Sequence, residues 1–364
     1  MKKLNVLVPS VLALFVASAA HAGATFDTPQ GKLSIGGDVE YDVTANSYQE
    51  GNHADATDSQ FSSGRILLDI NGERALANGN FAAFKLNPMW GQQGNDKGAD
   101  DAWFSFGVKN DWAFKIGHFE AYDLSPAGQD TYVADDHMNL YRAKDGRGRN
   151  SSSYADGTPA GGHILLSKEV GQWHYELGTQ FGADGDTSQS LYTADGVTVV
   201  KNKDPLLARP VVAWTGDTVT VAVGAEINLI SDAYVADLGG TDARESISDW
   251  TGYAATTTIK ATDDLSFSLR GAYRSADEFD QYTVGPGVQY QNFYIAYLYG
   301  ATNPDGSDNN TTNHLTYASY KIPGVMGLDN FDMYLGASYG RTKTDGDAEA
   351  DKDYGARVRF KYFF

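Results

Sequence analysis

The sequence predicts an all-β fold: a 16-stranded antiparallel transmembrane β-barrel with short periplasmic turns and long external loops. Three observations predict this fold. The chain opens on an export signal, apolar and polar residues alternate with a period of two in many segments, and short and long connections alternate between those segments. A strand with one apolar and one polar face suits a barrel wall, because lipid lies outside and water inside.

Composition excludes several other classes of protein. The chain has 364 residues, no Cys and a formal charge of −19. The lack of Cys excludes a disulfide scaffold and a Cys-ligated metal site, and the acidic balance disfavours nucleic acid as a partner, because phosphate contacts need basic patches. The mean hydropathy of −0.40 excludes a helical membrane bundle. A barrel agrees with this value, since only every second strand residue faces lipid.

The first element in the chain is a secretory signal peptide at residues 1–22. Lys2 and Lys3 give it a positive start, an apolar stretch follows, and the small residues at positions 20 and 22 form a cleavage site. We predict cleavage after Ala22, which leaves residues 23–364 as one β-barrel in the outer membrane. Losing two lysines takes the formal charge to −21. A membrane anchor is the alternative, and the shortness of the apolar run and its interruption by Pro9 disfavour it.

The strands follow in order from the period of two. In the first, Tyr41 and Val43 alternate with Glu40 and Asp42, which predicts an apolar face toward lipid and an acidic face toward the lumen. Pro210 in the eighth predicts a bulge or a local break. The predicted strands are 32–44, 62–71, 80–87, one on either side of each turn at 110–111, 170–172, 216–217, 262–264, 291–292 and 323–330, and 353–364.

The connections between these strands are alternately short and long. Short turns of Asn, Asp and Gly are typical of hairpins, and long polar loops are typical of the external side of an outer-membrane barrel. The even number of strands then places both termini on the periplasmic side. The predicted external loops are 45–61, 88–100, 120–161, 183–205, 231–249, 275–281, 303–311 and 340–352.

Two hairpins resemble those of the general porins of Gram-negative bacteria. Residues 65–84, RILLDINGERALANGNFAAF, resemble an early porin hairpin, and residues 102–117, AWFSFGVKNDWAFKIG, resemble the next one. In that family a long third loop follows and folds into the pore, and residues 120–161 occupy its place. Among porins the chain looks closest to glycoporins that take up raffinose or chitooligosaccharides.

The resemblance implies a function and partners. It implies a passive diffusion channel for small hydrophilic solutes and ions across the outer membrane, and a carbohydrate-selective pore is a further expectation. It also implies a homotrimer in contact with outer-membrane lipid and lipopolysaccharide. The chain departs from the family where Asp100 and Asp101 stand in place of a basic residue. Inward carboxylates at this point favour cations or neutral solutes.

The third loop, residues 120–161, has a polarised charge. Its acidic residues precede its basic ones, so carboxylates would face inward bases on the wall if the first half crosses the lumen. Opposed charges across a narrow gap set ion preference. The alternative is a solvated external loop. The predicted constriction and selectivity residues are Glu120, Asp123, Asp130, Asp135 and Asp136, then Arg142, Arg147 and Arg149 later in the loop, and Arg65, Lys85 and Lys115 on the wall.

Aromatic side chains near this loop are candidates for stacking on sugar rings. They are Tyr122, Tyr132 and Tyr141 in the loop and Trp90 in the second long loop. Packing within the protein is the alternative for each of them.

The last predicted strand places Arg357, Arg359 and Lys361 inward, beside the acidic face of the first strand where the barrel closes. One interpretation is a set of salt bridges along the seam, each contributing about 0.2–1 kcal/mol. The other is a continuation of the selectivity wall.

Other functions find little support in the sequence. A barrel enzyme of the protease or lipase type needs a nucleophile with His and acid partners, and no G-x-S-x-G motif occurs. A secreted glycan-binding β-protein would be polar on both faces of many strands. The acidic segments 305–308 and 345–353 could hold Ca²⁺ or Mg²⁺, but solvated charge explains them as well. We therefore predict no catalytic residue, no cofactor and no resident metal.

Overall fold

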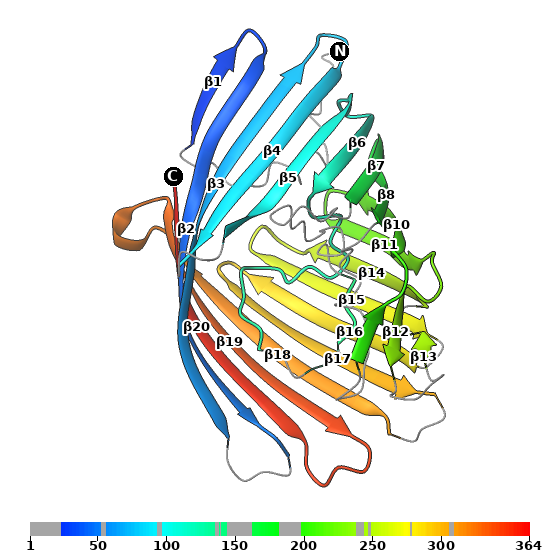
Figure 1. Ribbon diagram of the computed structural model, residues 1–364. Coiled ribbons are helices and arrows are strands. Elements are labelled where there is room, and N and C mark those ends of the chain that lie inside the picture. Colours follow the sequence, from blue (N-terminus) through cyan, green and yellow to red (C-terminus); the bar gives the residue numbers. More distant parts are fainter. Residues whose placement is uncertain are drawn as a thin grey trace.

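Sixteen antiparallel strands form a closed barrel in the computed structural model (Figure 1), which confirms the predicted fold class. The structure describes residues 23–51, 56–92, 97–134, 138, 140–143, 162–181, 198–237, 244–246, 249–276, 279–305 and 309–364. The predicted signal peptide at residues 1–22 lies outside this range, so its cleavage remains a prediction. No described helix is both long and apolar enough to span a bilayer.

The barrel wall runs in chain order, each strand pairing with the next. Its strands are β2 (Gly31–Gln49), β3 (Thr57–Ala75), β4 (Asn80–Gly91), β5 (Lys97–Val108), β6 (Trp112–His118), β7 (Gly162–Val170), β8 (Trp173–Phe181), β10 (Leu206–Thr215), β11 (Val219–Asn228), β14 (Trp250–Lys260), β15 (Leu265–Ala276), β16 (Phe279–Tyr290), β17 (Phe293–Pro304), β18 (Thr311–Ile322), β19 (Phe331–Thr344) and β20 (Asp351–Phe363).

Four short strands and one short helix complete the described structure. β9 (Thr198–Lys201), β12 (Tyr234–Asp237) and β13 (Arg244–Ser246) form a three-stranded sheet within the long loops, where the sequence predicted no strand. A 3-10 turn, η5 (Val325–Gly327), lies between β18 and β19. β1 (Ala24–Thr28) forms a hairpin with the start of β2, which the sequence did not predict because the segment carries no clear alternation.

The alternation of side chains determines which face of the wall meets water. On β2, Asp42 is 6% exposed and the neighbouring Val43 is 52% exposed. Outward side chains such as Val43 lie on the outer surface of the protein, which faces lipid in a membrane barrel. Inward side chains such as Asp42 are covered by other groups in the lumen. The first and last predicted strands thus have the predicted faces.

The barrel closes where β2 pairs with β20 (Figure 1). Glu40 lies opposite Lys361, and Asp42 lies opposite Arg359. The terminal Phe364 completes this seam, since its backbone N–H donates to the Gly37 carbonyl at 3.0 Å and its carbonyl accepts from the Gly37 N–H at 2.9 Å. Beyond this point β1 takes over the same edge of β2, pairing with its first residues up to Ile35.

Two prolines affect the strand ladders differently. The pairing register between β4 and β5 shifts between Leu86 and Pro88, which is a bulge that the sequence did not predict. At Pro210 the register of β10 stays constant on both sides, and only the pairs with β11 at Arg209 and Pro210 are missing. The ladder is therefore broken locally there, without the bulge that was the other expectation.

Candidate functional site

The third long loop, named L3 here (residues 119–161, between β6 and β7), lies against the inner wall of the barrel wherever the structure describes it. The described parts are 119–134, 138 and 140–143. Gln129 donates to the hydroxyl of Ser319 on β18 at 3.1 Å, and the Ala134 N–H donates to Ser338 on β19 at 3.0 Å. Both partners face the lumen, so this part of L3 is internal.

Glycines on the wall make room for L3. A Cβ at Gly355 of β20 would lie 2.6 Å from the ring of Tyr132, and one at Gly252 of β14 would lie 1.9 Å from the hydroxyl of Tyr141. Such distances are shorter than van der Waals contact, so any side chain there would displace the loop. The inward glycines with an L3 atom within about 3 Å of their Cβ position are Gly224, Gly252, Gly300, Gly336, Gly340 and Gly355.

A buried charged group holds both ends of the described L3 segment. Arg209 of β10 lies between Glu226 at 3.3 Å and Glu176 at 3.6 Å, and it donates to the carbonyl of Tyr122 at 2.7 Å. Its guanidinium also donates to the carbonyl of Ala143 at 3.4 Å. Because Arg209 is 2% exposed and Glu226 is fully buried, each charge depends on the others for its stabilisation.

Tyr122 and Tyr141 belong to this attachment. The Tyr141 hydroxyl donates to Glu226 at 2.7 Å, and its ring meets Trp250 edge-on. The Tyr122 N–H donates to Glu176 at 3.1 Å, and its ring stacks on His174. Burial, with the nearby carboxylates of Glu176 and Asp123, raises the pKa of the Tyr122 phenol, so it stays neutral. Both tyrosines therefore pack L3 onto the wall.

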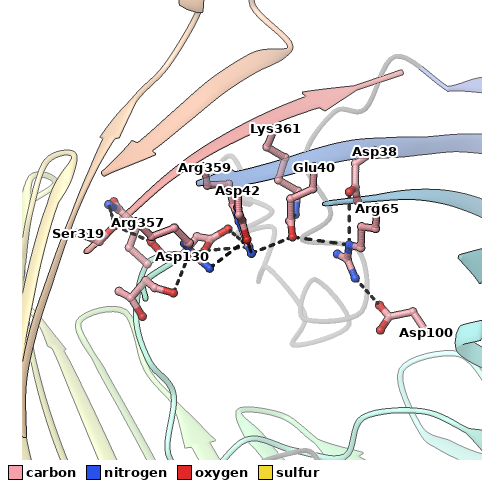
Figure 2. Close-up of polar contacts among 12 residues, drawn as sticks. Asp38, Glu40, Asp42, Arg65, Asp100, Asp130, Ser319, Arg357, Arg359 and Lys361 are labelled. Atoms are coloured by element: carbon pink, nitrogen blue, oxygen red, sulfur yellow. Dashed lines mark hydrogen bonds and ion pairs between the residues drawn. The ribbon is translucent and has the colours of Figure 1, made fainter. Parts of the chain in front are cut away.

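Asp130 is the point where L3 meets the closing seam. Figure 2 shows its carboxylate between two arginines of β20. It accepts from Arg357 at 2.8 Å and from Arg359 at 3.0 Å, and its backbone carbonyl accepts from the Ser319 hydroxyl at 2.5 Å. Charged groups that share hydrogen bonds in this way are fixed in position.

The charges continue along the seam from Arg359 (Figure 2). Arg359 makes a bidentate pair with Asp42, both contacts at 2.7 Å, and reaches Glu40 at 2.8 Å. Lys361 donates to the other oxygen of Glu40 at 3.1 Å. The salt-bridge interpretation of the seam is therefore correct in its geometry, and Asp130 joins the same network from L3.

The wall bases named from the sequence have wall carboxylates as partners. Arg65 lies 3.8 Å from Glu40 and 4.0 Å from Asp100, and Lys85 lies 3.0 Å from Asp101. Among the described residues, no ion pair joins Arg65 or Lys85 to L3. The two aspartates that depart from the family pattern thus neutralise the wall bases directly.

Lys115 has a different environment. It is buried, and its ammonium lies 4.6 Å from the centre of the Trp103 ring and 5.0 Å from that of Phe119. Cations are attracted to aromatic faces at such distances. Trp103 therefore faces the lumen, beside the base of L3.

The other predicted loop charges are placed as follows. Glu120 is exposed, and Asp123 accepts from the N–H of Ser125 at 2.7 Å as a turn cap. Arg142 of L3 lines a small cavity together with Arg270 of β15 and Tyr317 of β18. Asp135, Asp136, Arg147 and Arg149 lie outside the described residues, so their roles remain predictions.

Of the remaining aromatic candidates, Tyr132 faces the lumen and Trp90 does not. The Tyr132 hydroxyl donates to Asn46 at 2.6 Å, and Arg357 lies over its ring. Trp90 lies within β4, opposite Ile66, and both side chains are exposed on the outer face. The prediction that Trp90 contacts sugars is wrong for this reason: β4 continues past Pro88, so Trp90 is a wall residue.

A cavity of about 660 Å³ lies beside β2 to β7, at the end of the barrel where the short turn between β5 and β6 lies. Trp103 lines it together with the polar residues Asp69, Asn71, Lys85 and Lys115. Within the described part of the chain, no group of three His, Asp or Glu residues could hold a metal ion. The described residues include all of the acidic segment 345–353. Of the other acidic segment, 305–308, they include only residue 305.

Sequence reasoning missed the central partners of Asp130. Arg357 and Arg359 were expected in the lumen, in seam salt bridges or in the selectivity wall, but not as partners of Asp130. The signal for an inward base was present in the alternation of β20. Which part of L3 reaches that strand depends on the closed ring and could not be deduced from spacing.

Comparison with known proteins identifies the family. The sequence model of the porin-like glycoporin RafY family matches residues 35–364. The chain belongs to this porin family. No curated protein sequence matches it.

Solved porins share the fold of this porin. A substituted variant of the Rh. blastica porin is 13% identical, with a TM-score of 0.54, and the match covers 91% of this chain and 100% of that one. The outer-membrane protein OmpT of Vibrio cholerae is 14% identical, with a TM-score of 0.55, covering 94% of this chain and 100% of that one. Family and fold together support an outer-membrane barrel with a channel function.

Proposed function

We propose that this porin is a passive diffusion channel that prefers cations over anions. The observation that carries the preference is the excess of carboxylates in the charged network where L3 meets the wall. Five carboxylates face four bases there. The carboxylates are Asp38, Glu40, Asp42, Asp100 and Asp130, and the bases are Arg65, Arg357, Arg359 and Lys361.

The described contacts of L3 favour a passage on one side of the lumen. L3 is attached to β8, β10, β18, β19 and β20, whereas the large cavity lies along β2 to β7. Solutes would pass between L3 and that wall, along the charges of Asp130, the seam and the neighbouring base Arg65. Fixed charges near a water-filled gap bias which ions occupy it.

The cation preference is tested by the Asp130→Asn variant in planar bilayers under a KCl gradient. We expect stepwise ion currents from both proteins and a lower cation-to-anion permeability ratio in the variant, because one carboxylate is lost and both arginines remain. The matched control is Asp263→Asn, since Asp263 lies fully exposed in a turn. An unchanged reversal potential for Asp130→Asn would contradict the proposal, and absence of current from the wild type would contradict the channel itself.

A carbohydrate preference is the second proposal, and Trp103 supports it. This aromatic ring lies in a lumen cavity whose other walls carry Asp69, Asn71 and Lys85. The combination of an aromatic face with hydrogen-bonding groups suits a pyranose ring. The cavity volume of about 660 Å³ also falls in the range of small-molecule sites, about 300–1,000 Å³.

Current block by oligosaccharides tests the carbohydrate preference. We expect a trisaccharide to reduce the current with a saturable dependence on concentration, and the Trp103→Ala variant to need several-fold more sugar for half block. Phe267→Ala on the outer face is the control. If no sugar in a panel blocks the wild type, the pore is general.

We also propose that the barrel assembles as a homotrimer, which cross-linking in detergent would test.

A further inference from the structure

A row of basic side chains crosses the outer face of three neighbouring strands, β18, β19 and β20. Arg341 of β19 lies directly opposite His314 of β18 on one side and Lys352 of β20 on the other. Tyr339 and Tyr354, two residues along β19 and β20, are exposed on the outer face. Because strand side chains alternate between faces, Arg341 and Lys352 point outward as well. These three basic residues, His314, Arg341 and Lys352, are named the basic row here.

Arg341 and Lys352 carry like charges at directly opposite positions. Side chains at such positions have Cβ atoms about 4.5–5.5 Å apart, and like charges there are destabilising. Among the described residues, which include the acidic connection 345–350, no ion pair joins either of them to a carboxylate. The strand on the far side of Lys352 places the neutral Gln49 opposite it. In a chain with 47 acidic and 28 basic residues, two adjacent bases without a carboxylate indicate an anion from outside the chain.

Tyrosines place the basic row at the edge of the membrane. Tyr297, Tyr339 and Tyr354 lie in the next register row toward the middle of the strands. The rings of Tyr339 and Tyr354 are 5.0 Å apart, and the Tyr297 hydroxyl lies 2.7 Å from Nδ1 of His314. Aromatic girdles mark the membrane–water interfaces of barrels, and charged groups on the lipid-facing surface are tolerated there but not at the midplane.

The row also lies at one particular end of the barrel. Arg341 and Lys352 flank the connection between β19 and β20, which is one of the long loops, and the C-terminus lies at the other end of β20. Long loops are external in outer-membrane barrels. The basic row is therefore at the level of the headgroups of the external leaflet.

We propose that the basic row binds a phosphate group in the headgroup of an external-leaflet lipid. The guanidinium of Arg341 can donate two parallel hydrogen bonds to phosphate oxygens, and the ammonium of Lys352 adds a point charge beside it. The acyl chains of the same lipid would lie along the outward side chains of Tyr339, Tyr354 and Leu335, which are exposed on this face. A free phosphate would use only the charges, so the adjoining apolar strip favours a lipid.

This arrangement has two consequences. Side chains supply the positive charge, so the lipid should stay bound without a divalent cation. The phosphate would also join β19 to β20, the strand that closes the barrel with β2, and remove the repulsion between Arg341 and Lys352. Because the row lies on the outer face, binding there should leave conduction through the lumen unchanged.

Native mass spectrometry of the refolded mature chain in detergent tests the proposal, with diphosphorylated lipid A as the probe. We expect saturable retention of this lipid, and at least tenfold weaker retention of its dephosphorylated form, which has the same acyl chains. The Arg341→Gln variant should weaken retention of the phosphorylated lipid at least fivefold. The matched control is Arg74→Gln, because Arg74 is an exposed base near the opposite end of the barrel, and its affinity should equal that of the wild type.

A second variant keeps the test valid if one protein folds poorly. Lys352→Gln removes the point charge but keeps the guanidinium, and we expect at least a twofold loss in affinity; heat-modifiable mobility on gels shows that each variant is folded. EDTA should leave the bound lipid in place.

Four results would each overturn the proposal. They are equal retention of the two forms of lipid A, release of the lipid by EDTA, equal affinity of Arg341→Gln and Arg74→Gln, and loss of an oligomer by Arg341→Gln with unchanged lipid retention. The last result would assign the basic row to a contact with a second copy of this chain. None of them bears on whether the barrel conducts, which the bilayer currents report separately.

Discussion

Arg209 illustrates how strongly one residue can determine the position of L3. Its guanidinium reaches two glutamates of the wall and two backbone carbonyls of L3. The charges are buried, so the network is stable only while all members are present. The loop and the wall are thus joined by a charged group and not by apolar packing alone.

Replacement of Arg209 should therefore destabilise the barrel. In Arg209→Gln, Glu176 and Glu226 would remain buried with no guanidinium between them, and we expect a loss of about 3–5 kcal/mol in the free energy of unfolding. Chemical denaturation with guanidinium chloride in detergent measures this loss of stability. Arg74→Gln, at an exposed position at the end of β3, should change stability by less than about 0.5 kcal/mol. A loss below about 1 kcal/mol for Arg209→Gln would contradict this account.

Residue by residue, the sequence predicted the direction of side chains better than their partners. The alternation placed Glu40, Asp42 and Arg359 in the lumen, as observed. It failed for Trp90, because the predicted strand 80–87 ends before Pro88, whereas β4 continues past a bulge there. Alternation is a local property of the chain, whereas a bulge depends on the neighbouring strand.

At the scale of elements, L3 and the glycines of the wall form one unit. The glycines occur on β11, β14, β17, β19 and β20, and each leaves space for a different L3 side chain or backbone segment. Their positions are scattered in the sequence and form an interrupted strip along the wall from β11 to β20 only when the barrel is closed. For this reason the length of L3 indicated that it matters, but its course along the wall could not be predicted.

A side chain on this strip should displace the loop and widen the pore. In Gly355→Val the added carbons would overlap the Tyr132 ring, which lies 2.6 Å from the Cβ position. We expect a higher unitary conductance, by roughly a factor of two if that portion of L3 leaves the lumen, because barrels of this strand number without an obstruction hold an open aqueous channel. Single-channel recording measures the change.

Gly271 provides the control for this substitution. It lies on the outer side of β15, and its Cβ position is 3.6 Å from the nearest atom, so Gly271→Val should conduct like the wild type. Equal conductance of Gly355→Val and the wild type would show that L3 keeps its position without the glycine.

At the scale of the whole molecule, the chain has a formal charge of −19, and the lumen network contains charges of both signs. Long-range effects of the total charge are screened over about 10 Å at 0.1 M salt and about 3 Å at 1 M salt. Charges in contact with a passing ion act at both concentrations. The two contributions can therefore be separated by changing the salt concentration.

We expect the cation-to-anion permeability ratio to fall when the salt concentration rises. Reversal potentials measured under tenfold KCl gradients, one centred near 0.05 M and one near 0.5 M, should give a ratio at least twofold higher in the dilute case. Asp130→Asn should retain this dependence but with lower ratios at both concentrations. A ratio independent of salt would indicate that only contact charges act.

The closing seam has a consequence for how the chain reaches its folded state. One edge of β2 pairs with β20, the last strand of the barrel wall in chain order, so this edge stays without its main partner until that strand is available. Contacts of such large sequence separation form slowly, and an unpaired strand edge attracts other chains. The hairpin with β1 covers residues Gly31–Ile35 of that edge from the beginning. We therefore expect β1 to protect this part of the β2 edge from other chains before the barrel closes. Removal of β1 should increase aggregation during folding more than it alters conduction by the folded channel.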